Sequence, residues 1–383
     1  MASRYNHSIS FVLAFCLLPT ILYSASPEIR VLLAEAPLNE PTTWVITANH
    51  ELTLAPAKEN DRRVSLGSQI SIQATDTTII INGKKKLVRA PLRIDPVTAD
   101  GVLHFGTRSY QGALLIIPYK TNTLLINSIE LERYVLCVLR SESWPGWPLE
   151  VDKALAIACR SYAVAKMLEA QASKLPYHIK NTNAHQTYHG HHTVGTLRRA
   201  VQETEGVILG YQKKPVLAMF DCCCGGLIPA LIENVDFSKA PYLARTKACT
   251  YCASCKIYSW RKTVSKKELT ERLQKKFPQI KKLERIEITR RDAAGTIQRV
   301  AIHYGTKNPL IISGKKLYGL LPEAKSFCFT IDNTKDTFTI TGRGYGHHLG
   351  LCQWGVRQMV REGWHYEDIL QFFYPGVSFM KIS

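Results

Sequence analysis

The feature of this sequence that most restricts its fold is a change of hydrophobic period near residue 130. Up to that point the chain contains short alternating or β-branched runs, such as ALLIIPY at 113–119 and TLLINSIEL at 123–131, broken by Gly, Asn, Asp and Pro. Such runs predict β-strands. Beyond it the period becomes helical, and a helix is expected to begin at Pro148, with an apolar stripe through Leu155 and Tyr162.

The rest of the chain mixes both kinds of element. The expected elements are a helix at 196–205, strands at 207–211 and 216–220, a helix at 265–277, a hairpin at 284–304, a strand at FTITG, and helices at 352–362 and 366–373. Ser265 with Glu268 three residues later is a capping-box pattern for the basic helix. Strands scattered among several helices, without regular βαβ alternation, predict an α+β fold with mixed β-sheets.

The N-terminus predicts export. One Arg is followed by an apolar run from Ile9 to Tyr23 and then by small residues, which is the layout of a secretory signal peptide over residues 1–26. An uncleaved N-terminus acting as a membrane anchor, or a lipoprotein Cys16, are the alternatives. The expected location is the periplasm or cell envelope, and peripheral contact with a membrane is compatible with it.

Positive charge is concentrated in one segment. The chain has a formal net charge of +18, and residues 261–316 alone carry 16 Lys and Arg against 5 Asp and Glu. A basic face attracts nucleic acid, anionic lipid or acidic polymers. For an exported protein nucleic acid is excluded as the partner, and bacterial wall with its carboxylate-bearing peptides fits better; a solvated face without a partner is the alternative.

These patterns divide the chain into five parts. They are a signal peptide (1–26), a β-rich N-terminal part (27–130), a core with a cysteine cluster (131–260), a basic helix-plus-hairpin subdomain (261–330), and a glycine-rich motif with helices that completes the core (331–383).

Two long blocks resemble one family. LERYVLCVLRSESWPGWPLEVDKALAIACRSYA at 131–163 and GRGYGHHLGLCQWGVRQMVREGWHYEDILQFFYPGV at 342–377 resemble, in the right order, the signatures of the SpoIID/LytB family of stage II sporulation proteins D and amidase enhancers. Weaker agreement, including HQTYHG at 185–190, extends the resemblance over residues 28 to 380.

The resemblance implies a SpoIID-like fold and action on peptidoglycan. Enzymatic members are lytic transglycosylases, which cut between N-acetylmuramic acid and N-acetylglucosamine in peptide-stripped glycan and leave 1,6-anhydro-muramic ends. They serve cell-wall remodelling, sporulation or division. Other members are non-catalytic enhancers of an N-acetylmuramoyl-L-alanine amidase, which is the alternative for this chain. Neither role requires a cofactor.

Glu142 matches the catalytic acid of the family, and the chemistry agrees. Ordinary glycoside hydrolysis uses two carboxylates. In a lytic transglycosylase the 6-hydroxyl of the sugar replaces water, so one Glu can protonate the leaving oxygen and then accept the hydroxyl proton. To begin as an acid it needs a raised pKa, which apolar surroundings supply. Trp144 and Trp147 are expected to provide that environment and a platform for sugar rings.

Five further residues match substrate-binding positions of the family. They are Arg160, Gln186, Tyr188, His347 and Gln353. Arg160 could hold Glu142 or a substrate oxygen through a forked contact, or it could pin the helix as an ion pair. The glycines around His347 and Gln353 allow positive φ and close approach of a ligand.

Cysteines raise a question of metal against disulfides. Cys224, Cys249, Cys252 and Cys255 suit a structural zinc site, whereas an oxidising compartment makes disulfides between the two groups an alternative. Some family members bind zinc around a Cys-Gln element. In this chain the element is His185-Gln186, with His in place of Cys, so the resemblance does not predict zinc at that place. Cys137 and Cys159 fall on helical stripes and are expected in the core.

Overall fold

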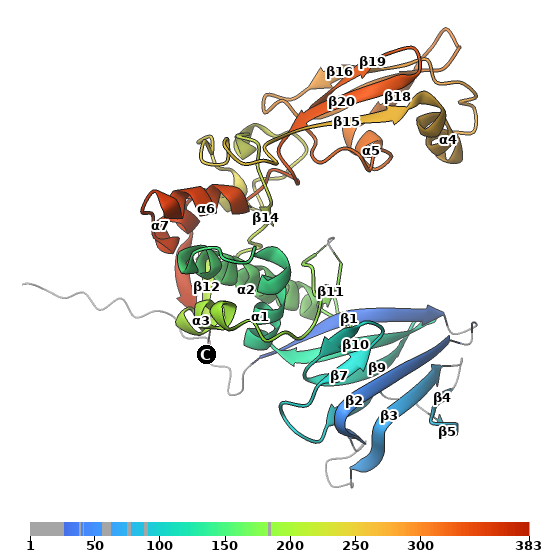
Figure 1. Ribbon diagram of the computed structural model, residues 1–383, viewed down its shortest axis with the longest axis vertical. Coiled ribbons are helices and arrows are strands. Elements are labelled where there is room, and N and C mark those ends of the chain that lie inside the picture. The colour runs from blue at the N-terminus through green and yellow to red at the C-terminus, as the bar shows by residue number, and fades with distance from the viewer. Residues whose placement is uncertain are drawn as a thin grey trace, which may run out of the picture.

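The computed structural model describes residues 27–37, 40, 42–55, 63–74, 78–87, 91–182 and 185–382. The predicted signal peptide lies outside these residues. Figure 1 shows three tiers along the long axis: a twisted sheet, a layer of helices, and a second group of strands with two helices at the far end. The α+β prediction is confirmed. In the part of the chain described, no helix has the length and apolarity needed to span a bilayer.

The first tier is a sheet of eleven strands. Its strands are β1 (Glu28–Pro37), β2 (Thr42–Leu54), β3 (Val64–Ala74), β4 (Thr78–Ile81), β5 (Lys84–Leu87), β6 (Leu92–Pro96), β7 (Leu103–Phe105), β8 (Arg108–Tyr110), β9 (Ala113–Tyr119), β10 (Asn122–Glu130) and β11 (Ile179–Lys180). The main order is β11-β1-β10-β9-β6-β2-β3-β4-β5, with β7 joining β2 to β8. All described contacts are antiparallel except that of β11 with β1, which brings the loop after the long helix onto the sheet.

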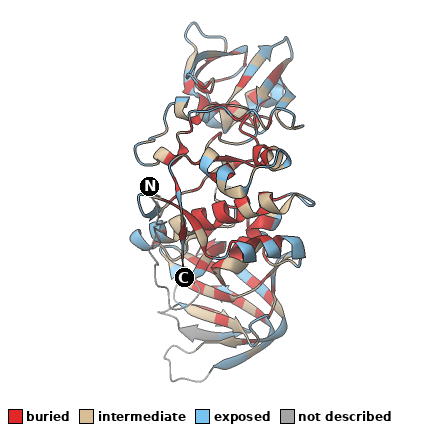
Figure 2. Cartoon of the chain, turned by 90° about the vertical axis from the view of Figure 1, so that its left-hand side faces the viewer, coloured by how far each residue is buried: buried red, intermediate tan, exposed pale blue. Residues whose placement is uncertain are grey.

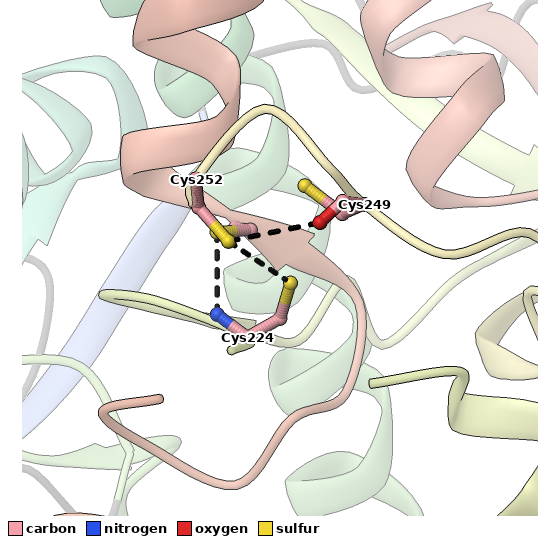
Figure 3. A group of neighbouring side chains, drawn as sticks. Cys224, Cys249 and Cys252 are labelled. Atoms are coloured by element: carbon pink, nitrogen blue, oxygen red, sulfur yellow. Dashed lines mark hydrogen bonds between the residues drawn. The ribbon is translucent and has the colours of Figure 1, made fainter. Parts of the chain in front are cut away.

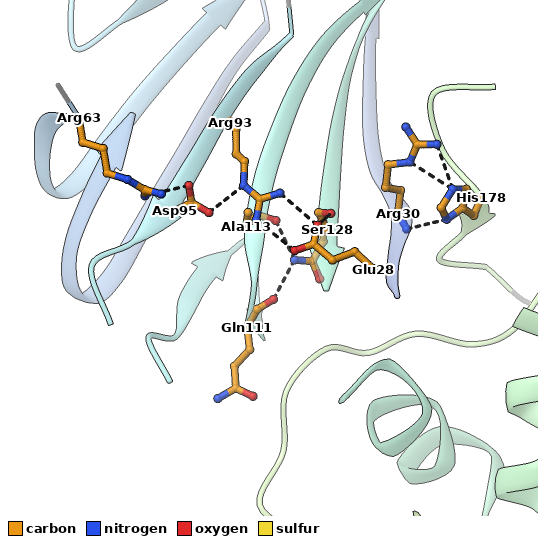
Figure 4. A network of polar contacts seen from close by, with 10 residues as sticks. Glu28, Arg30, Arg63, Arg93, Asp95, Gln111, Ala113, Ser128 and His178 are labelled. Carbon is orange, nitrogen blue, oxygen red and sulfur yellow. Dashed lines mark hydrogen bonds and ion pairs between the residues drawn. The ribbon is translucent and has the colours of Figure 1, made fainter. Parts of the chain in front are cut away.

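Polar side chains tie this sheet together at two places (Figure 4). The guanidinium of Arg93 bridges Glu28 at 3.1 Å and Asp95 at 2.9 Å, so it connects β1 to β6. At the neighbouring edge the Arg30 backbone N–H donates to Nδ1 of His178 at 3.0 Å. Burial, together with the charge of Arg30, lowers the pKa of His178 to about 4. His178 is therefore a neutral anchor that docks the loop after the long helix.

The middle tier is built around one buried helix. It contains α1 (Leu131–Glu142), α2 (Leu149–Ala172), α3 (Gly195–Glu203), α6 (Gln353–Arg361) and α7 (Tyr366–Phe373), with short strands β12 (Val207–Tyr211), β13 (Lys214–Pro215), β14 (Phe220–Asp221), β21 (Leu351–Cys352) and β22 (Ser378–Lys381). Every residue of α2 from Val151 to Ala163 is buried except Lys153. The predicted stripe thus lies in a part of α2 that is enclosed on all sides, within the buried centre of the molecule coloured red in Figure 2.

The prediction of a continuous strand at 216–220 is wrong. Only β13 and β14 form at its two ends. Between them Leu217 N–H donates to the Tyr242 hydroxyl at 3.0 Å, and Met219 C=O accepts from Leu351 N–H and the Tyr374 hydroxyl. Tertiary partners thus satisfy this backbone in place of a ladder.

The third tier has its own core. It contains β15 (Ser259–Ser265), α4 (Lys266–Lys276), β16 (Arg285–Arg291), β17 (Ile297–His303), β18 (Leu310–Ser313), α5 (Gly314–Tyr318), β19 (Phe329–Asn333) and β20 (Thr337–Arg343). Its apolar cluster runs from Val264 to Ile340, so the basic subdomain extends beyond the expected boundary at 330, because β20 pairs with β15. Ser265 caps α4 as predicted: its hydroxyl accepts from Glu268 N–H at 3.1 Å.

Arg160 is fully buried in the middle tier. Its Nε and Nη2 donate to the two oxygens of Glu132 at 2.8 and 2.6 Å, and Nη1 donates to the Val207 carbonyl at 3.0 Å. This forked pair joins α2 to α1 and β12. Breaking a buried pair leaves an uncompensated charge, which costs far more than an exposed pair is worth.

We expect Arg160→Met to lower the free energy of unfolding by about 3–5 kcal/mol, because Glu132 loses its charged partner and keeps only the Gly206 N–H. Arg199→Ala, which removes an exposed pair with Glu203, should change it by less than about 1 kcal/mol. Urea unfolding of both variants measures the difference. Full stability of Arg160→Met combined with loss of ligand affinity would make Arg160 a binding residue instead.

Candidate functional site

A pocket of about 440 Å³ lies where the middle tier meets the C-terminal block. This volume is in the range of small-ligand sites. Its lining comes from five separate segments: Ser141, Glu142, Tyr162, His185, Thr187, Met219, Phe220, Asp221, Cys222, Tyr345, Gly346, His347 and Gln353. Of the predicted site residues, the pocket brings together Glu142, His347 and Gln353.

Glu142 is the last residue of α1 and is half-buried. Oε1 accepts from the Thr187 backbone N–H at 3.1 Å, and Oε2 accepts from the Gln353 side-chain amide at 3.3 Å. Burial raises the pKa of the Glu142 carboxyl above its usual value, while the hydrogen bonds from Thr187 and Gln353 oppose that rise. The arrangement favours the acid form and still provides donors for the carboxylate once its proton has left.

A tight turn holds the end of α1 against the start of α2. The Ser143 hydroxyl donates to Oδ1 of Asp152 at 2.5 Å, and both side chains are buried. Trp147 N–H donates to the Trp144 carbonyl at 3.2 Å, and Gly146 between them has φ of +78°. Pro followed by Gly at the two central positions is typical of a type II turn. The Trp-Pro-Gly-Trp segment therefore fixes where α1 ends, and with it Glu142.

The glycine-rich turn of the C-terminal block is closed by Asp221. Its Oδ2 accepts from His348 N–H at 2.7 Å. Gly346 has φ of +132°, and a Cβ there would come within 2.3 Å of the Asp221 Cβ, so glycine is required. His347 lines the pocket, and desolvation lowers the pKa of its ring to about 4, which keeps it neutral.

In the HQTY segment at 185–188, the residues that line the pocket are not the two that the family motif predicted. Gln186 is 1% exposed and contacts the Tyr134 hydroxyl at 3.0 Å; Tyr188 is fully buried and donates to Oδ1 of Asn127 at 2.6 Å. Their neighbours His185 and Thr187 line the pocket. Side chains of an extended segment alternate, so the expected lining role of Gln186 and Tyr188 is corrected: they anchor the segment in the core.

Trp144 and Trp147 lie outside the pocket lining. Trp144 is 46% exposed, Lys256 Nζ lies 5.6 Å from its ring centroid, and both tryptophans pack edge-on against Trp354, at 6.1 and 5.7 Å between ring centroids. The aromatic residues that line the pocket with Glu142 are Tyr162, Phe220 and Tyr345, so the expected role of the two tryptophans as its apolar lining is corrected. We call Trp144, Trp147 and Trp354 the tryptophan shelf: Trp144 is exposed, whereas Trp147 and Trp354 are part-buried and pack against the core.

Arg160 does not line the pocket either, since its side chain is fully buried against Glu132. The sequence left two roles open for Arg160, a contact with the substrate or Glu142 and an ion pair that holds the helix. Its contacts form the ion pair. It contributes to the site by holding α2, which carries Tyr162 into the pocket.

The cysteine cluster differs from the expected set in one member. The sulfurs of Cys224, Cys249, Cys252 and Cys352 lie within 4.8 Å of one another, and all four residues are buried. Cys255 instead has its Sγ 3.6 Å from that of Cys223. Cys352 was missed because it lies about a hundred residues from the others in sequence. Cys137 and Cys159 are buried as predicted.

The histidine-rich loop gathers no second cluster of this kind in the described chain. Three of its histidines have separate partners: His185 Nδ1 accepts from Lys180 N–H at 2.9 Å, His189 contacts the Ser141 hydroxyl at 3.1 Å, and His192 contacts the Leu136 carbonyl at 2.8 Å. These contacts fix the loop beside Glu142.

Comparisons with known proteins find two matching domain profiles and several similar proteins. The profile described as "Stage II sporulation protein" (SpoIID) matches residues 119–211, and that of a domain of unknown function, DUF8618, matches residues 243–350. An uncharacterized protein of Brachyspira hyodysenteriae is 34% identical over 75% of this chain and 76% of its own length.

Two Bacillus subtilis proteins are also similar. "Stage II sporulation protein D" is 28% identical over 71% of this chain and 81% of its own length. "Amidase enhancer" is 24% identical over 63% of this chain and 39% of its own length.

The raised pKa of Glu142 predicts a pH-dependent stability difference from Glu142→Gln. The folded protein binds the proton more tightly than the unfolded chain, so the stability of the native protein falls as pH rises above the ordinary carboxyl value of 4.5. Gln cannot ionise, so the variant should gain stability relative to the native protein between pH 4 and pH 7.

Urea unfolding at several pH values checks this. Asp152, whose pKa burial raises to about 6, is present in both proteins and cancels in the difference. A stability difference that is constant with pH, or that moves the other way, would contradict the burial of an acid form at position 142.

Proposed function

We propose, because this chain belongs to the SpoIID/LytB family, that it is an exported peptidoglycan lytic transglycosylase. Family membership indicates a role related to the cell wall. The proposal is that the protein cuts the bond between N-acetylmuramic acid and N-acetylglucosamine in peptide-stripped glycan, leaving 1,6-anhydro-muramic ends, during wall remodelling or division. The predicted signal peptide supports export to the periplasm or cell envelope.

The observation that carries this proposal is the environment of Glu142. It is a pocket acid with a raised pKa, and it accepts hydrogen bonds from two segments that lie far apart in sequence. A general acid needs its proton at the working pH, and desolvation shifts the pKa of Glu142 in that direction. A carboxyl placed only to cap a helix or carry surface charge would gain nothing from such burial.

Glu142 acts twice in the proposed cycle. The protonated carboxyl gives its proton to the glycosidic oxygen as the bond to the muramic carbon breaks. The resulting carboxylate is stabilised by the N–H groups of Thr187 and Gln353, which already contact its two oxygens. It then accepts the proton of the 6-hydroxyl as that oxygen closes the 1,6-anhydro ring, which regenerates the acid without an attacking water.

The presence of Asp221, a second carboxyl in the pocket lining, raises the alternative of ordinary hydrolysis. Hydrolysis with a separate base or nucleophile requires such a pair. Against that role, Asp221 is 6% exposed, its Oδ2 is bonded to His348 N–H, and burial raises its pKa well above the usual value. We therefore assign Asp221 to positioning the glycine-rich turn.

A non-catalytic enhancer of a wall amidase is the second candidate. The relative named "Amidase enhancer" favours it, and so do the exposed Trp144 of the tryptophan shelf and the basic subdomain. Exposed basic residues there, including Lys267, Lys275 and Lys281, suit an anionic wall polymer or membrane surface. This role would not need the acid form of Glu142.

Mass analysis of denuded glycan strands after incubation with the protein separates these functions. The proposal predicts products with 1,6-anhydro ends. Glu142→Gln should lower the rate by about 10²–10⁴-fold, the usual contribution of a general acid or base. Glu169→Gln, which alters an exposed carboxylate of α2, is the control and should leave the rate unchanged.

The other outcomes decide among the alternatives. Reducing ends, each one water heavier than the anhydro product, together with inactivity of Asp221→Asn, would establish hydrolysis by two carboxyls. Intact strands combined with faster cleavage by an added amidase would establish the enhancer role. Either result would overturn the transglycosylase proposal.

A further inference from the structure

The four clustered cysteines come from three separate parts of the middle tier. Cys224 follows β14, Cys249 and Cys252 belong to one turn, and Cys352 ends β21. Figure 3 shows Cys224, Cys249 and Cys252 converging on one point beside the helices of the C-terminal block. All four are buried, and their sulfurs lie within 4.8 Å of one another. The reaction proposed above does not use them.

We propose that these four thiols bind a structural Zn²⁺ ion that holds the start of α6 in place, and with it the Gln353 side chain that contacts Glu142. The assigned ligands are Cys224, Cys249, Cys252 and Cys352. The metal joins two turns of the middle tier to the C-terminal block.

The spacing of the sulfurs fits a tetrahedral ion. Zn–S bonds of about 2.3 Å place the sulfurs of a tetrahedral site about 3.8 Å apart. The Sγ atoms of Cys224 and Cys252 are 3.8 Å apart. Cys249 and Cys252 have the Cys-x-x-Cys spacing that lets one turn supply two ligands. A disulfide joins sulfurs in pairs, whereas here four sulfurs share one centre.

Backbone groups around Cys352 suit a thiolate. Its Sγ accepts from Cys224 N–H at 3.3 Å and from Gly355 N–H at 3.4 Å, which makes it the N-cap of α6. Donors of this kind orient a metal ligand and stabilise its negative charge. A Cβ on residue 355 would come within 2.8 Å of Cys249 Sγ, so a glycine there gives the sulfur its room.

The link to the pocket is covalent and short. Cys352 is followed directly by Gln353, whose amide donates to Glu142, and then by Trp354 of the tryptophan shelf. Fixing Cys352 therefore fixes the register of the first turn of α6. A metal at this place acts as a positioning element for both the pocket and the shelf, without touching substrate.

Metal analysis of the purified full-length protein tests the site without reference to any reaction. Native mass spectrometry and elemental analysis should find one zinc ion per chain. Cys352→Ser and Cys224→Ser should each lower zinc occupancy to below about a tenth. Cys255→Ser, a nearby cysteine outside the group of four, is the matched control and should keep full occupancy.

A second measurement covers the case in which the serine variants fail to fold. Native protein loaded with Co²⁺ in place of zinc should show the thiolate charge-transfer and tetrahedral ligand-field bands of a four-sulfur site. A metal-free folded protein whose mass reveals disulfides among these four cysteines would overturn the proposal, as would a Co²⁺ spectrum without thiolate bands.

Hydrogen exchange tests the positioning role. Removing the metal with a chelator should speed amide exchange by at least about tenfold in the first turn of α6, residues 353–356, and leave α4 in the separate basic subdomain unchanged. Unaltered exchange in α6 after complete zinc removal would refute the link between the metal and Gln353. Because neither readout involves glycan, this proposal can fail while the transglycosylase proposal stands, and the reverse.

Discussion

The hydrogen bond from Gln353 to Glu142 is the contact on which the candidate site depends. It joins residues 211 positions apart, one at the end of α1 and the other at the start of α6. The two family blocks thus become one pocket only when the C-terminal helices have returned to the middle tier. Much of the intervening chain, with the basic subdomain, is an insertion that leaves this contact intact.

The surroundings of Glu142 lower the stability of the folded protein but favour the protonated form that the proposed reaction needs. Burying an ionisable carboxyl is unfavourable, and only two N–H donors compensate for it. The rest of the structure supports that arrangement: the Ser143–Asp152 bond fixes the helix end, the Arg160–Glu132 pair fixes α2, and Asp221 closes the glycine-rich turn. Rigid supports of this kind keep a strained or desolvated functional group in position.

Sequence patterns predicted the elements that depend on local rules. The helix capped by Ser265 and the hairpin after it follow from capping and alternation, and Glu142 followed from the motif around it. Gln186 and Tyr188 were misplaced because a motif match does not say which face of an extended segment meets the pocket. The side chains that line the pocket are those of the neighbouring residues His185 and Thr187. Thr187 contacts Glu142 through its backbone N–H, which a pattern of side chains cannot predict.

Contacts between distant segments were the hardest to predict. The fourth member of the cysteine group is Cys352 because tertiary packing, not spacing, decides which sulfurs converge. Asp221 gave no signal before the pocket was seen, since a lone acid before a cysteine triplet resembles any turn residue. The tryptophans next to Glu142 in sequence pack against Trp354 and do not line the pocket, a contact between distant segments that spacing does not predict.

The most direct measurement is an NMR titration of the Glu142 carboxyl carbon in the folded protein, assigned by comparison with Glu142→Gln. The account predicts a midpoint above the ordinary value of 4.5, so that the chemical shift of the Glu142 carboxyl still reports a protonated acid at pH 4.5. A midpoint at or below 4.5 would mean that the pocket stabilises the carboxylate, and Glu142 could not then begin the reaction as its acid.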